Sequence, residues 1–120
     1  MRLSDIMTRE VLTIGPTETV ALALSRMKAA RIHHLVVTKG RQLVGLLSER
    51  DLGRPEDRVA RSKMAVSELM TPDPICADPE MPVRRAANIL RGRSIGSLPI
   101  VKDGELIGIV TLSDLLELVG

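Results

Sequence analysis

The sequence predicts an α+β protein built from two β-α-β-β-α units that pack sheet to sheet with pseudo-twofold symmetry. Three observations predict it: the sequence repeats itself, each copy contains one amphipathic helical pattern, and each copy then contains two β-rich runs joined by a short turn. The chain has 120 residues and is 44% hydrophobic, so a substantial core is expected. Half of this length would bury too little surface to be stable alone, and two units that share a core avoid that difficulty.

The internal repeat has one constant offset of 63 residues, which aligns residues 3–52 with residues 66–115 without a gap. The offset relates Met7-Thr8 to Met70-Thr71, Leu43-Val44-Gly45 to Leu106-Ile107-Gly108, and Asp51-Leu52 to Asp114-Leu115. We therefore define repeat 1 as residues 1–58 and repeat 2 as residues 59–120. Residues 53–65 read as a polar, basic connection, in which Gly53 and Pro55 indicate the end of a helix.

Each repeat is expected to open with a short strand, at residues 11–14 and 74–77, before Pro16 or Pro79 interrupts the chain. An amphipathic helix follows, because apolar residues recur at spacings of three and four. These residues are Val20, Ala23, Leu24, Met27 and Ala30 in repeat 1, and Val83, Ala86, Ala87 and Leu90 in repeat 2. We expect the helices to end around Arg31 and at Gly92.

Two β-rich runs come next, at residues 34–38 and 43–47 in repeat 1 and at residues 98–101 and 106–110 in repeat 2. The second pair is joined through Asp103-Gly104, and Asp-Gly between apolar runs is a strong hairpin signal. A closing helix is predicted to start at Ser48 in repeat 1 and at Thr111 in repeat 2.

Each repeat has a hydroxyl residue at this strand-to-helix corner and an aspartate three positions later, as Ser48 with Asp51 and Thr111 with Asp114. Such a pair resembles a capping box, in which the side chains satisfy free backbone N–H groups. The same geometry suits a ligand, because a helix N-terminus attracts phosphate and one carboxylate can accept hydrogen bonds from both hydroxyls of a ribose. Both interpretations remain open from the sequence.

The order of motifs resembles tandem cystathionine-β-synthase (CBS) domains, which together form a Bateman module. The pattern is Met-Thr, a short strand, Pro, a helix, Ile-x-x-Leu, Leu-(Val/Ile)-Gly and (Ser/Thr)-x-x-Asp, and it occurs twice, over residues 3–52 and 66–115. The resemblance implies a regulatory module, not an enzyme, with AMP, ADP or ATP bound in clefts between the repeats. S-adenosylmethionine is an alternative ligand, and a homodimer is expected from the same resemblance.

The resemblance also implies composite sites, each drawing residues from both repeats. One site would combine Asp114, Thr111 and Ser113 with Leu12, Ile32 and His33, and the other would combine Asp51, Ser48 and Arg50 with Ile75, Ile95 and Gly96. His34 and Ser97 occupy the position that often reaches a phosphate. Because His34 can carry a charge and Ser97 cannot, the two sites are expected to be unequal.

Other function classes find less support in the sequence. There is no Phe, Tyr or Trp on which nucleic-acid bases could stack, and the arginines around residues 84–93 lie in no helix-turn-helix pattern, so nucleic acid is not an expected partner. No P-loop or paired nucleophile and base suggests catalysis, and no catalytic cofactor is expected. A ligand-free module for dimerisation or for binding an unidentified protein is the main alternative.

The histidines and the cysteine also suggest no special chemistry. His33 and His34 are neighbours that would point to opposite faces of a strand, and no Cys/His cluster accompanies them, so no metal is expected. Cys76 is the only cysteine, which excludes an internal disulfide, and we expect it to be a small core residue. Without a signal peptide or a membrane-spanning apolar run, a cytoplasmic location is expected.

Overall fold

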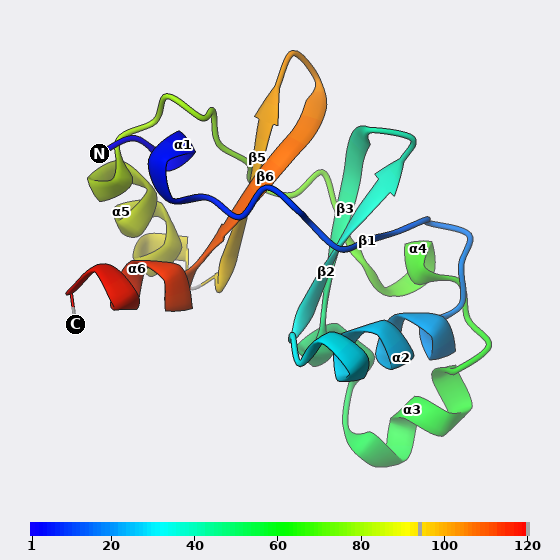
Figure 1. Cartoon of the computed structure of the whole chain (residues 1–120). Helices are drawn as coiled ribbons and strands as arrows, with labels where there is room; N and C mark the ends of the chain where they lie inside the picture. The colour runs from blue at the N-terminus through cyan, green and yellow to red at the C-terminus, as the bar shows by residue number, and fades with distance from the viewer. Residues whose placement is uncertain (94, 120) are drawn as a thin grey trace. The chain divides into compact units, whose positions relative to one another are not determined.

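A computed structural model describes residues 1–93 and 95–119 of the chain, and it divides them into two compact units (Figure 1). The central unit comprises Leu12–Pro74, and the split unit comprises Met1–Val11 together with Ile75–Gly120. The long helices and the hairpins occur in the predicted order, so the α+β class with two repeats is confirmed. The predicted opening strand at residues 74–77 is only an isolated bridge at Ala77, and the one at residues 11–14 is the two-residue strand Thr13–Ile14. Within the described residues, no helix has the length and apolar character needed to cross a bilayer.

The central unit is organised around a short sheet. Its strands are β1 (Thr13–Ile14), β2 (His34–Lys39), β3 (Gln42–Ser48) and β4 (Thr71–Pro72). β1 is parallel to β2, β2 is antiparallel to β3, and β3 is antiparallel to β4. The helical elements are α2 (Val20–Ala30), the 3-10 turn η1 (Glu49–Leu52), α3 (Pro55–Arg61) and α4 (Val66–Leu69).

The split unit repeats this plan with shorter pairings at the edges of its sheet. It contains α1 (Leu3–Ile6), α5 (Val83–Arg93), β5 (Ser97–Lys102), β6 (Glu105–Thr111) and α6 (Leu112–Val119). β5 and β6 form an antiparallel hairpin. At its edges, Ala77 makes a parallel bridge to Ile100, and Thr8 makes an antiparallel bridge to Ile109. The Asp103-Gly104 turn has positive φ at both residues, 51° and 82°, as the predicted hairpin requires.

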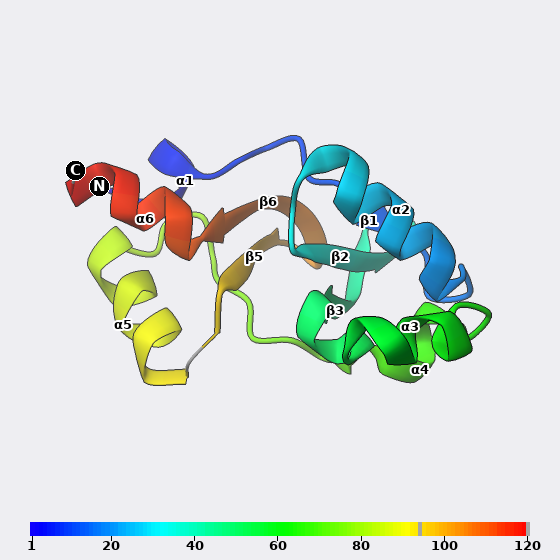
Figure 2. The same cartoon turned by 90° about the horizontal axis from the view of Figure 1, so that it is seen from below.

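The opening segments of the two repeats are exchanged between the compact units. Residues 1–11, from repeat 1, lie in the split unit, whereas residues 59–74, from repeat 2, lie in the central unit. The Leu3 N–H donates to the Met81 carbonyl at 2.9 Å, and the Val66 N–H donates to the Glu18 carbonyl at 2.8 Å. In both views α1 lies beside elements of the split unit (Figures 1 and 2). The compact units therefore have different bounds from repeats 1–58 and 59–120, which remain a division of the sequence.

Each unit buries its own apolar cluster. The central cluster is Ile14, Val20, Ala23, Met27, Leu35, Val37, Leu47, Leu52 and Val66. The split cluster is Leu3, Met7, Ala77, Ala86, Leu90, Leu98, Ile100, Val110 and Leu115. Both clusters contain residues of an exchanged segment, so each segment contributes to the core of the unit that it joins.

The two amphipathic helices form where the apolar spacing predicts them. The hydroxyl oxygen of Thr19 accepts the Leu22 N–H at 3.2 Å and so caps α2, and Arg31 ends that helix in the left-handed region with φ of 56°. Ala30 was predicted to lie on the apolar face but is exposed. Gly92 was predicted to end the second helix but lies inside α5, which continues to Arg93.

The connection at residues 53–65 follows the end of a helical element as predicted, because η1 ends at Leu52 and Gly53 is its C-cap with a positive φ of 78°. The connection also contains helix α3, which was not predicted and which begins at Pro55. Proline suits the first helical position, because the N–H group that it lacks would have no partner there. Cys76 is exposed, whereas the next residue, Ala77, is buried and bridges to Ile100. Since neighbours in extended backbone point to opposite sides, Ala77 takes the core position that was predicted for Cys76.

Candidate functional site

The first strand-to-helix corner joins the end of β3 to η1. The Ser48 N–H donates to Asp51 Oδ2 at 2.8 Å, and the Ser48 hydroxyl donates to the same oxygen at 3.1 Å. Both residues are partly buried. The aspartate therefore caps the turn, as the capping interpretation predicts. The predicted closing helix is only a four-residue 3-10 turn here, too short to provide a substantial helix dipole.

The second corner joins β6 to α6 in the same way. The Thr111 N–H donates to Asp114 Oδ2 at 2.8 Å, and the Asp114 N–H donates to Thr111 Oγ1 at 3.2 Å, which completes a reciprocal capping box. Asp114 is also partly buried. Because the cap uses Oδ2 of each carboxylate, it does not require Oδ1. Capping and ligand binding by the same aspartate are therefore compatible.

Each corner lies against the loop that precedes the first strand of its hairpin. The Glu49 N–H donates to the His33 carbonyl at 2.9 Å, and the Leu112 N–H donates to the Gly96 carbonyl at 2.9 Å. These two bonds are related by the 63-residue offset. In the sheets, His34 pairs with Ser48 and Ser97 pairs with Thr111. Each compact unit thus brings an aspartate and a hydroxyl residue together with the preceding loop of the same repeat.

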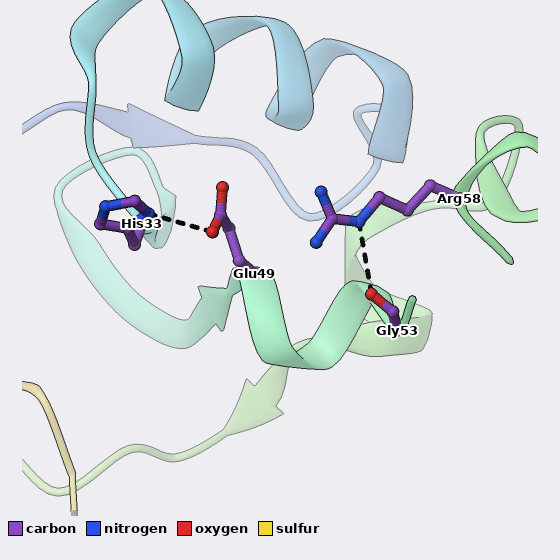
Figure 3. Close-up of polar contacts among 4 residues, drawn as sticks. All are labelled: His33, Glu49, Gly53 and Arg58. Atoms are coloured by element: carbon purple, nitrogen blue, oxygen red, sulfur yellow. Dashed lines mark hydrogen bonds and ion pairs between the residues drawn. The ribbon is translucent and has the colours of Figure 1, made fainter. Parts of the chain in front are cut away.

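The side chains around the two corners differ in charge. His33 Nδ1 lies 3.0 Å from Glu49 Oε2, and the histidine side chain is 80% exposed (Figure 3). The equivalent residues in repeat 2 are Gly96 and Leu112, which cannot form such a contact. The sequence analysis did not identify Glu49 as a site residue. Glu49 could have been found from its position directly after Ser48, because the turn at the corner brings its side chain close to His33.

The remaining predicted site residues are apolar or small. Leu12 and Ile75 are exposed, at 48% and 37%; Leu12 directly precedes β1, and Ile75 lies two residues before Ala77, which bridges to Ile100. Ile32 and Ile95 are partly buried, and their N–H groups donate to the Met27 and Leu90 carbonyls at the ends of α2 and α5. The predicted composite groups, such as Asp114 with Leu12 and Ile32, draw on both compact units and stay predictions.

Met7 and Met70, the methionines of the Met-Thr motif, pack against the glycine of the Leu-(Val/Ile)-Gly motif. A Cβ atom at Gly108 would lie 3.0 Å from Met7 Cγ, and a Cβ atom at Gly45 would lie 3.0 Å from Met70 Cγ. The two motifs thus form one contact, made within each compact unit through an exchanged segment. No group of three His, Cys, Asp or Glu side chains among residues 1–93 and 95–119 is arranged to hold a metal ion.

Comparison with known proteins identifies the repeat unit. The CBS domain family matches the chain twice, at residues 3–54 and 66–120. An inosine-5′-monophosphate dehydrogenase of Korarchaeum cryptofilum is 36% identical over 114 residues, which cover 94% of this chain but only 23% of that enzyme. A CBS domain-containing protein of Dictyostelium discoideum is 34% identical over 129 residues, covering 97% of this chain and 89% of that protein.

Two similar solved structures contain adenosine derivatives. The CBS domain pair of protein MJ0100, in complex with 5′-methylthioadenosine and S-adenosyl-L-methionine, superposes with a TM-score of 0.88 at 26% identity, covering 100% of this chain and 96% of that one. CBSX2, in complex with AMP, superposes with a TM-score of 0.87 at 27% identity, covering 98% of this chain and 95% of that one.

Proposed function

The chain belongs to the CBS domain family, and on that premise we propose that it is a regulatory module that binds an adenosine-containing ligand at its strand-to-helix corners. The observation that carries the proposal is the twice-built corner, where a partly buried aspartate is held in place by a backbone N–H through Oδ2 alone. Similar CBS pairs hold AMP, S-adenosylmethionine and methylthioadenosine, and these ligands share a ribose and an adenine.

The ribose is the part of the ligand that suits the aspartates. Its two neighbouring hydroxyls are donors, and a carboxylate oxygen that is not needed for the cap can accept from them. The cap fixes the carboxylate before the ligand arrives, so little side-chain entropy is lost on binding. In this proposal Asp51 and Asp114 hold ribose hydroxyls, and Ser48 and Thr111 lie beside them as further hydrogen-bonding groups.

The adenine would be held by aliphatic side chains, because the chain has no aromatic residue. Leu12 and Ile75 expose large apolar surfaces, and Ile32 and Ile95 are partly buried in the loops beside the corners. Covering exposed apolar area with a planar base is favourable by about 25 cal/mol per Å². We retain the predicted grouping, in which each site takes its ribose aspartate from one repeat and its apolar residues from the other, as part of the proposal.

The proposed module acts by regulation and not by catalysis. Binding would shift an equilibrium between conformations, and it can do so only by the difference in affinity for the two states. We propose that the output passes through a homodimer or through a protein partner. AMP, ADP and ATP are the first candidate ligands, and S-adenosylmethionine is the alternative.

Calorimetric titration with AMP, ATP and S-adenosylmethionine tests the proposal. Asp114→Asn keeps an oxygen that can accept the Thr111 N–H but removes the negative charge, so we expect affinity to fall about tenfold with unfolding free energy nearly unchanged. Asp5→Asn is the matched control, because Asp5 Oδ2 accepts the Arg2 N–H at 2.8 Å in a similar cap away from both corners. Flat titrations of the unmodified protein with all three compounds would refute ligand binding and favour the ligand-free interaction module.

A further inference from the structure

The two corners are built alike in their backbone but carry different side chains at equivalent positions. The bonds from Glu49 to His33 and from Leu112 to Gly96 have the same length, 2.9 Å, and the Ser48 and Thr111 N–H groups both donate to their aspartates at 2.8 Å. A ligand ribose held by either aspartate would therefore meet a similar backbone. Any difference in ligand preference must come from the side chains around it.

The first corner has a cation next to its aspartate in the sequence. Arg50 immediately precedes Asp51 and is exposed, and its guanidinium has no hydrogen-bonding or ionic partner among residues 1–93 and 95–119. The neighbouring carboxylate of Glu49 contacts His33, with Glu49 Oε2 3.0 Å from His33 Nδ1 (Figure 3), and it makes no ion pair with Arg50 within residues 1–93 and 95–119. The His33–Glu49 contact thus leaves the guanidinium available to an anion.

The second corner has no charged group at these positions. The residues equivalent to His33, Glu49 and Arg50 are Gly96, Leu112 and Ser113. Leu112 is 48% exposed and offers an apolar surface next to the corner. Asp114 is the only ionised side chain among residues 111–114, so this corner has no cation in its turn to attract a phosphate, whereas Arg50 lies in the turn of the first corner.

We propose that the two corners are specialised: the Asp51 corner takes an adenosine 5′-phosphate through Arg50, and the Asp114 corner takes an adenosine derivative without a phosphate, such as a 5′-thioether. The proposal rests on the proposed function, since it assumes that both aspartates hold a ribose. Guanidinium suits the task because it presents paired N–H donors that match the oxygens of a phosphate.

The helix dipoles favour a phosphate at the Asp114 corner instead of the Asp51 corner, but their effect on affinity is smaller than that of Arg50. α6 has eight residues and η1 has four, so a dipole would favour a phosphate at the Asp114 corner. A charge at an exposed helix terminus gains about two- to fivefold in affinity, whereas a hydrogen bond between charged groups gains about tenfold or more. The arginine therefore outweighs the dipole.

Calorimetric titration with AMP and with adenosine tests the specialisation, because these two ligands differ only by the phosphate. Asp114→Asn isolates the first corner and Asp51→Asn isolates the second. In the Asp114→Asn protein, we expect Arg50→Ser to weaken AMP binding about tenfold and to change adenosine binding less than about twofold. Arg54→Ser, which removes another exposed arginine of the same unit, should leave both affinities unchanged.

The reciprocal change provides the second half of the test. In the Asp51→Asn protein, Ser113→Arg should raise the affinity for AMP about tenfold and leave adenosine binding unchanged. The specialisation is overturned if Arg50→Ser leaves the ratio of AMP to adenosine affinity unchanged, or if AMP prefers the Asp114 corner. A protein that binds neither compound refutes the proposed function itself, which is a different result from binding both compounds without discrimination at either corner.

Discussion

Substitution of Gly45 by alanine tests the packing of the exchanged segments. A Cβ atom at this position would lie 3.1 Å from the Thr71 carbonyl oxygen and 3.0 Å from Met70 Cγ, with the Met70 sulfur closer still. The methionine side chain can move, but the carbonyl belongs to β4, which is hydrogen-bonded to β3 at this point. Added volume at such a site destabilises by about 1–3 kcal/mol.

Alanine also restricts the unfolded chain, which stabilises the folded state by about 0.4–1 kcal/mol. We therefore expect Gly45→Ala to lower the unfolding free energy by about 1–2 kcal/mol. Gly96→Ala is the matched control, because a Cβ atom at Gly96 has no heavy atom within 4 Å. The unfolding free energy of Gly96→Ala should rise by up to about 1 kcal/mol, so the unfolding free energies of the two variants should differ by about 2 kcal/mol.

Urea unfolding followed by far-ultraviolet circular dichroism measures this difference, since the chain has no tryptophan to report by fluorescence. Gly108→Ala should repeat the loss in the split unit, where the Thr8 carbonyl oxygen would lie 3.1 Å from the new Cβ. Adding Met70→Ala to Gly45→Ala should relieve only the side-chain part of the crowding. Equal stabilities of Gly45→Ala and Gly96→Ala would refute the close approach of the exchanged segment.

Three further predictions follow from burial and helix geometry. Gly92 lies inside α5 with open space around it, so Gly92→Ala should raise the unfolding free energy by about 0.5–1 kcal/mol, and an unchanged or lower melting temperature would contradict this. Leu3 is fully buried in the split cluster, and Leu3→Ala should cost about 2–5 kcal/mol in a urea titration, whereas fraying of the N-terminal segment predicts almost no loss. Cys76 is exposed, so a thiol reagent should modify the folded protein without denaturant, and protection until unfolding would show that the side chain is covered.

The features with strong local signals were predictable from the sequence. Both hairpins and both long helices were predicted from patterns that occur in each repeat. In α2, for example, Val20, Ala23 and Met27 recur at spacings of three and four, and these are the residues that the helix buries. The capping role of Asp51 and Asp114 was visible in the Ser/Thr-x-x-Asp spacing, because a capping box is formed by residues three positions apart.

Features that depend on distant contacts were not predictable in the same way. Cys76 and Ala77 have similar apolar character, and only the bridge from Ala77 to Ile100 decides which of them faces the core. The His33–Glu49 contact joins residues that the hairpin brings together, so neither residue alone indicates it. Gly53 and Pro55 follow the end of η1 as predicted, but Pro55 also begins α3, and there is no apolar spacing in the sequence from which that helix could be predicted.

The exchange of opening segments explains why a period in the sequence did not give the bounds of the compact units. An offset of 63 residues relates Leu3 to Val66 and Met81 to Glu18, and the bonds from Leu3 to Met81 and from Val66 to Glu18 obey the same offset. The offset therefore does not reveal which repeat residues 1–11 pack against. The burial of Leu3 in one cluster and Val66 in the other then ties each unit to a segment of the opposite repeat. A single repeat cut at residue 58 would keep an opening segment without the unit that it joins, so we expect it to be less stable than the whole chain.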